Sequence, residues 1–269
     1  MPRRHVLSHP DRRPRLEGQR LPEPLTSTRP GSDRASETSG EKPGRRAASA
    51  RGARTRARLL DAAERLWGER GVEGVSLREI RIAAGQRNSS ALQFHFTNRE
   101  GLLLALVDRH MPRIFAIQED LYADLVATGR QDDLAALVEV MVRPTAEYLR
   151  RGPSARAWVR ISAERLARPE TGPAQMAGHV HPVGIEVGTR VHRHLTTFLD
   201  DDLALDRLLS VLVATHHLCA DRSRVEEAPR GGTGRPPLPF DRWLANLVDM
   251  AIGALSVAPA GGSGGRRRA

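Results

Sequence analysis

The chain has few of the residues that build disulfide frameworks, metal sites or aromatic-rich cores. It contains one cysteine, Cys219, which excludes an internal disulfide and a zinc site made of cysteines. Aromatic residues make up only 4% of the sequence, so the core has to be built mainly from aliphatic side chains. The ten histidines form no HExxH pattern, and no glutamate stands three residues before a histidine. We therefore expect no metal, no cofactor and no enzymatic activity.

Long apolar runs are also missing. No run approaches the roughly 18 residues that a membrane-spanning helix needs. The N-terminus has no apolar centre of the kind found in signal peptides. These absences favour a cytoplasmic protein with no membrane partner.

Positive charge is plentiful, but it lies at the two ends of the chain. The formal net charge is +10. Residues 1–58 hold 15 Lys and Arg against 6 Asp and Glu, and three arginines stand at 266–268. Residues 59–265 hold 24 basic and 26 acidic residues, which leaves them almost neutral. The net charge alone is thus only weak support for nucleic-acid binding.

Composition divides the chain into a folded part and two tails. Residues 1–50 are rich in Pro, Arg, Ser and Gly and show no hydrophobic period, so we expect a disordered extension. It is either dispensable or an arm that attracts phosphates without sequence preference; a transit peptide is a third alternative. Residues 259–269 are expected to form a second disordered tail.

The stretch 55–110 has the strongest local signals. Apolar residues at helical spacing predict a helix from about Arg54 to Glu69, stopped by Gly71. Ser76 and Glu79 fit a capping box that opens a second helix, and Gly85 breaks it.

A third helix should follow, capped by Asn88 or Ser89 and anchored by Ala91, Leu92 and Phe94. A second capping box from Thr97 to Glu100 then predicts a fourth helix. Two short helices around a glycine turn make a helix-turn-helix, whose second helix enters the DNA major groove.

This block resembles the N-terminal domain of the TetR family of transcriptional regulators. The resemblance rests on the motifs SLREI (76–80), AG (84–85), ALQFHF (91–96) and NREGLL (98–103). It implies an all-α fold, with a helix-turn-helix DNA-binding domain at 51–98 and a helical ligand-binding and dimerisation domain at 99–258.

The resemblance also assigns DNA contacts by position. Gln93 can make a bidentate contact to adenine, and serine hydroxyls can bond base edges or phosphates. Between Gly85 and the aromatic end of the third helix, the chain has one residue more than the family commonly has. The base-facing register is therefore open by one position, and Arg87 is either a contact or the bulged residue. The expected DNA-binding residues are Arg56, Ser76, Leu77, Arg78, Arg87, Asn88, Ser89, Ser90, Gln93, His95 and Arg99. Phe94 and Phe96 are interpreted as packing residues.

Helical spacing continues from Met111 to about Val257. Pro112 suits the first turn of a new helix, and Pro144 would kink or split a later one. Large or polarisable side chains on these helices are candidates for an effector pocket, although ordinary core packing is the better explanation for any one of them. They are Phe115, Met141, Tyr148 and Trp158.

In the family, the last two long helices of each subunit form a four-helix dimer interface. Apolar stripes on the corresponding helices here could serve as that interface or as core within one chain. The candidate interface residues are Leu205, Leu209, Leu212, Cys219, Leu244, Leu247, Val248 and Leu255. His216 lies on the first stripe and is interpreted as a hydrogen-bonded interior or interface histidine.

The sequence therefore predicts a homodimeric, ligand-responsive transcriptional repressor. Its partners would be a double-stranded DNA operator and an unidentified small molecule. Two alternatives stay open: an architectural DNA binder of low specificity that uses its Arg-rich tails, and a helical small-molecule-binding protein with a vestigial DNA-binding domain.

Overall fold

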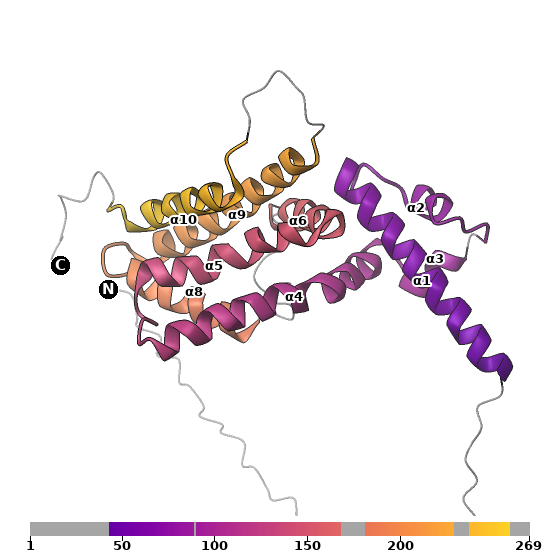
Figure 1. Ribbon diagram of the computed structural model, residues 1–269, viewed down its shortest axis with the longest axis horizontal. Coiled ribbons are helices and arrows are strands. Elements are labelled where there is room, and N and C mark those ends of the chain that lie inside the picture. Colours follow the sequence, from indigo (N-terminus) through magenta and orange to yellow (C-terminus); the bar gives the residue numbers. More distant parts are fainter. Residues whose placement is uncertain (1–42, 89, 168–180, 229–236, 259–269) are drawn as a thin grey trace, which may run out of the picture. The chain divides into compact units, whose positions relative to one another are not determined.

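The computed structural model describes residues 43–88, 90–167, 181–228 and 237–258. Every regular element within these ranges is a helix, which confirms the all-α fold for this part of the chain (Figure 1). The tail at 259–269, Ser89 and all of the N-terminal extension before Pro43 lie outside the described residues.

The first helix, α1 (Pro43–Arg70), is longer than expected. It starts within the segment predicted to be disordered, so that prediction does not hold for residues 43–50. The reason is local composition, since alanine and arginine have high helix propensity and proline is tolerated in a first turn. Gly71, at φ +79°, ends the helix in the left-handed conformation that the sequence predicted.

The helix-turn-helix consists of α2 (Leu77–Ala83) and α3 (Ala91–Phe96). The capping box is confirmed: the Glu79 amide donates to Ser76 Oγ, and the Ser76 amide donates to the Glu79 carboxylate. α2 ends in a Schellman motif at Gly85, whose φ is +67°. The amides of Gly85 and Gln86 donate to the carbonyls of Ile82 and Arg81.

Helix α4 (Arg99–Ala127) corrects two predictions. Its N-cap is Asn98, whose side chain accepts from the Gly101 amide, and not a capping box that starts at Thr97. It also runs through Pro112 without a break. Pro112 removes one intrahelical hydrogen bond, but His110 and Ile114 on either side are buried and hold the helix together.

The helices that follow α4 in the chain form the C-terminal part of the fold. α5 does not split at Pro144, and Asp133 caps it through the amides of Ala135 and Ala136. The bounds are α5 (Leu134–Tyr148), the 3-10 turn η1 (Leu149–Arg151), α6 (Pro153–Leu166), α8 (Pro182–Leu195), α9 (Asp201–Glu227) and α10 (Phe240–Ser256). Among these, α6 packs against both α9 and α1.

Helices α1 and α6 join the DNA-binding and C-terminal helices in one continuous hydrophobic core. At Gly68 the two helices approach so closely that an added Cβ would lie 2.7 Å from Ala157 Cβ. The Arg160 side chain donates to the Gly68 carbonyl at 2.7 Å and also pairs with Glu227. The DNA-binding domain is therefore packed directly against the C-terminal helices through α1.

Helix α9 is long and apolar enough to cross a membrane by length and composition alone. It packs against α5, α6, α8 and α10, and its buried residues include Thr215, Arg222 and Ser223. It thus has the place of a core helix, so its hydropathy is weak evidence for a membrane span.

Candidate DNA-binding interface and effector cavity

The turn between α2 and α3 is braced by Arg81, a residue that sequence reasoning did not single out. Its guanidinium Nη1 donates to the carbonyls of Gln86 and Arg87 at 2.7 and 3.0 Å. These carbonyls belong to the part of the turn that the sequence predicts to carry one residue more than the family commonly has. Arg87 itself has an exposed side chain. Two hydrogen bonds from Arg81 therefore brace the turn, and the Arg87 side chain is left exposed to solvent.

Polar side chains at the start of α3 are exposed. Asn88 Oδ1 accepts hydrogen bonds from the amide and the hydroxyl of Ser90, at 3.0 and 2.8 Å. Gln93 is exposed on the helix itself. Asn88 does not cap α3 directly, because the N-cap is Ser90 and no side-chain bond is made there. These three residues present amide and hydroxyl groups where the helix-turn-helix would face DNA.

The two phenylalanines of α3 have opposite environments. Phe96 is buried, and the Arg56 guanidinium lies 5.0 Å from its ring centroid. Phe94 is 84% exposed, so its interpretation as a packing residue is wrong. On a helix of this length only one side meets the core, and Leu92 and Phe96 take it. The half-buried His95 ring contacts both phenylalanines.

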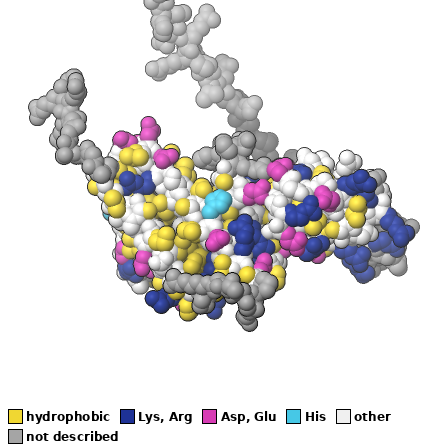
Figure 2. All heavy atoms as spheres, turned by 90° about the horizontal axis from the view of Figure 1, so that it is seen from above, with side chains coloured by type: hydrophobic (Ala, Val, Ile, Leu, Met, Phe, Trp, Pro, Cys, Tyr) yellow, Lys and Arg dark blue, Asp and Glu magenta, His cyan; other side chains and the backbone are white. Residues whose placement is uncertain are grey.

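The other residues predicted to contact DNA differ in their exposure to solvent and in the hydrogen bonds that they make within the protein. The Ser76 amide donates to the Glu79 carboxylate, so this particular amide is engaged within the capping box. Leu77 is half-buried against the core. Arg99 donates to the Val72 carbonyl and helps to hold the domain together. Arg56 and Arg78 are exposed. In Figure 2, Lys and Arg side chains gather at the end that holds α1–α3.

Comparison with known proteins identifies this domain. The family model described as "Bacterial regulatory proteins, tetR family" matches residues 59–106, which include α2 and α3. Residues 59–106 therefore match the DNA-binding domain of the TetR family. The N-terminal domain of the chain is a helix-turn-helix DNA-binding domain.

Two curated relatives are uncharacterized HTH-type transcriptional regulators from two strains of Mycobacterium tuberculosis. Each is 30% identical over 141 residues, which cover 51% of this chain and 66% of the relative. The match thus spans just under two thirds of the relatives' length.

Two solved structures match the chain at lower sequence identity. A regulatory protein of the tetR family from Rhodococcus RHA1 has 18% identity and a TM-score of 0.46, covering 76% of this chain and 98% of that chain. A gamma-butyrolactone receptor described as ArpA-like has 22% identity and a TM-score of 0.38, with the same two coverages.

The C-terminal helices enclose a cavity of about 320 Å³. Phe115, Met141 and Trp158 line it, as the sequence predicted. Tyr148 does not line it. The cavity wall is mainly apolar and draws on α4, α5, α6, α8 and α9. Its volume falls at the lower end of the range for small-molecule sites.

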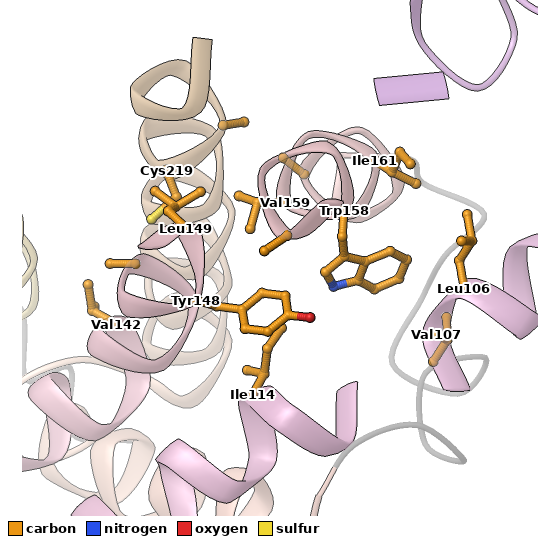
Figure 3. Close-up of a cluster of buried hydrophobic side chains, with 14 of the residues drawn as sticks. Leu106, Val107, Ile114, Val142, Tyr148, Leu149, Trp158, Val159, Ile161 and Cys219 are labelled. Atoms are coloured by element: carbon orange, nitrogen blue, oxygen red, sulfur yellow. The ribbon is translucent and has the colours of Figure 1, made fainter. Parts of the chain in front are cut away.

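Tyr148 instead belongs to a buried polar network beside the cavity. Its hydroxyl lies 2.8 Å from His110 Nδ1, and His110 Nε2 lies 3.0 Å from the Glu64 carboxylate on α1. The His110 ring stacks on Trp158 with an interplanar angle of 3°. Figure 3 shows Tyr148 and Trp158 reaching into the same buried cluster from α5 and α6. Sequence reasoning missed Glu64 and His110, whose spacing of 46 residues gives no local signal.

Polar groups in the cavity wall are mostly engaged by protein partners. Arg165 forms an ion pair with Glu100 at 2.9 Å, and His181 pairs with Glu119 at 3.0 Å. Ser162 donates to the Val159 carbonyl. The wall therefore offers a ligand little unpaired charge among the described residues.

His216 is a polar residue of the cavity wall whose second ring nitrogen has only a long contact. Its Nδ1 donates to the Leu212 carbonyl at 2.8 Å, and its Nε2 lies 3.5 Å from Thr145 Oγ1. Desolvation lowers the pKa of His216 and outweighs the opposing effect of the Leu212 carbonyl. The ring is neutral, so Nε2 is a hydrogen-bond acceptor in the cavity wall.

The predicted dimer-interface residues divide into two groups. Leu205 and Leu209 are exposed, and Leu212 is half-buried in the cavity wall. The others are buried within one chain: Cys219, Leu244, Leu247, Val248 and Leu255. These five are core residues because α10 packs its apolar stripe against α5 and α9 of the same chain.

Proposed function

We propose that this protein is a homodimeric, sequence-specific repressor of the TetR family in the cytoplasm, released from its operator by a small molecule. The exposed polar surface of α3 carries the proposal. The side chains of Asn88, Ser90 and Gln93 are exposed, and Arg81 braces the turn that leads into α3 through two hydrogen bonds. Groups preorganised in this way suit base contacts in the major groove.

Dimerisation would place two such helices on one face of DNA, about 34 Å apart. After the core residues of α9 and α10 are set aside, the same two helices still leave large apolar side chains exposed. They are Leu203, Leu205, Leu209, Leu218, Val225 and Met250. Exposed apolar side chains on two adjacent helices favour contact with a second copy.

The cavity supports a small-molecule effector. It is bounded in part by α4, whose first turn carries Glu100 and whose middle carries Phe115. One continuous helix thus connects the DNA-binding domain to the cavity. A ligand that prefers one spacing of the two DNA-binding domains would shift operator affinity by its differential affinity for the two states.

The decisive experiment is selection of DNA from a random pool by the full chain at near-physiological salt, because electrostatic binding dominates at low salt. We expect an enriched site with two-fold symmetry. Gln93→Ala should relax specificity at one base pair per half-site, by about 1–3 kcal/mol.

Arg78→Ala is the matched control, since loss of a phosphate contact weakens binding to all sequences alike. A pool that stays unenriched while the protein binds DNA would replace the proposal with the architectural alternative.

A further inference from the structure

Phe94 is the most exposed large hydrophobic side chain in the described part of the chain. Its exposed fraction is 84%, whereas the next highest value in this group is 63%, for Val257. An aromatic ring left in water is unfavourable, so such a side chain often marks a contact surface.

The ring is also held in place. Its neighbour His95 contacts it edge to face, with centroids 5.0 Å apart and an interplanar angle of 81°. The Phe94 amide donates to the Ser90 carbonyl at 2.9 Å, which fixes the backbone of the helix at this point. Phe94 thus presents an apolar surface on the same short helix that exposes Gln93.

The base edges in the major groove carry one prominent apolar group, the C5-methyl of thymine, and phenylalanine is among the side chains that contact it. We propose that Phe94 contacts a thymine methyl in each half-site and makes that base pair part of the recognised sequence. The inference rests on the proposed function and adds a specificity-determining residue to the polar contacts assigned above.

Deoxyuridine, which lacks only the methyl group, tests the proposal. The operator selected by the full chain would be resynthesised with each thymine replaced in turn, symmetrically in both half-sites. Dissociation constants would be measured by fluorescence anisotropy at one salt concentration. We expect one position at which uridine weakens wild-type binding, by roughly fourfold per half-site for one buried methyl group.

Phe94→Ala should bind the thymine operator more weakly than wild type and show no further loss with uridine at that position. Ile82→Ala is the matched control, because Ile82 is 58% exposed on α2, and it should keep the wild-type sensitivity to uridine. Both side chains are exposed, so thermal unfolding should confirm that both variants stay folded.

Three outcomes would overturn the inference. Wild-type affinity could be insensitive to uridine at every thymine, or Phe94→Ala could retain the wild-type sensitivity. Phe94→Ala could also weaken all sequences equally, which would indicate sugar or phosphate packing. In each of these cases a selected operator still supports the proposed function. If no operator is selected from the pool, both the proposed function and the inference about Phe94 are wrong.

Discussion

Glu64 and His110 form a buried polar contact between α1 and α4. Burial tends to raise the pKa of Glu64, but hydrogen bonds from His110, Ser154 and Arg109 and the charge on His110 outweigh it, and the pKa lies below its usual value of 4.5. A carboxyl group with a lowered pKa stabilises the fold fully above its unfolded pKa. That contribution is lost as pH falls through the lower, folded value.

Glu64→Gln should therefore lower the free energy of unfolding at pH 7 by about 2 kcal/mol, because a buried charge-assisted hydrogen bond is replaced by neutral ones. The difference from wild type should shrink as pH falls below about 4.5. Urea denaturation at pH 7 and at pH 4 measures both effects. Glu69→Gln, on an exposed ion pair with Arg65, is the control and should change stability little at either pH. A constant difference across this pH range would contradict the assignment.

At the scale of the secondary-structure element, the residues that end the helices determine the shape of the helix-turn-helix. Gly85 ends α2 and Gly129 ends α4 with the same Schellman hydrogen bonds and the same φ of +67°. At both positions an added Cβ would meet nothing within 4 Å. Substitution would thus cost only the backbone strain of a left-handed residue.

Gly85→Ala and Gly129→Ala should each destabilise the protein by about 1 kcal/mol. Only Gly85→Ala should also weaken operator binding, because it strains the turn that positions α3. Chemical denaturation and operator titration of both variants measure this. Equal operator affinity in the two variants would show that the turn does not set the position of α3.

At the scale of the whole molecule, the proposed function requires that effector binding changes the affinity for DNA. The cavity is mainly apolar and its charged groups are paired, while His216 Nε2 is available as an acceptor. The effector that fits this wall is neutral, mainly apolar and carries one hydrogen-bond donor.

Two small probes of nearly equal shape, 1-adamantanol and 1-fluoroadamantane, distinguish a cavity with a hydrogen-bond acceptor from one that is only apolar. The alcohol should bind the full chain more tightly, by roughly fivefold for one hydrogen bond. His216→Phe should reverse the order, since the hydroxyl then loses its water partners without compensation. Isothermal titration calorimetry measures both affinities.

Ser162→Ala is the matched control, because this cavity hydroxyl already donates to the Val159 carbonyl and should not affect the preference. A wild-type preference for the fluorinated probe would contradict the role of His216.

Much of the DNA-binding domain could be predicted from the sequence because its signals are local. The capping box of Ser76 and Glu79 acts over three residues, and Gly71 and Gly85 mark helix ends through their own backbone conformations. The exposure of Asn88, Ser90 and Gln93 followed from the same helix assignment. Such features depend on neighbours along the chain, so the sequence by itself determined them.

Tertiary structure decided which apolar side chains the protein buries. Leu244, Leu247 and Val248 pack inside one chain, and Phe94 remains in solvent, although all four belong to apolar patterns of similar appearance. The Glu64–His110 contact and the Gly68–Ala157 approach likewise join residues far apart in the sequence. Whether a side chain is buried depends on which helix packs against its own. A helical pattern in the sequence identifies an apolar face, but it does not show which surface, if any, covers that face.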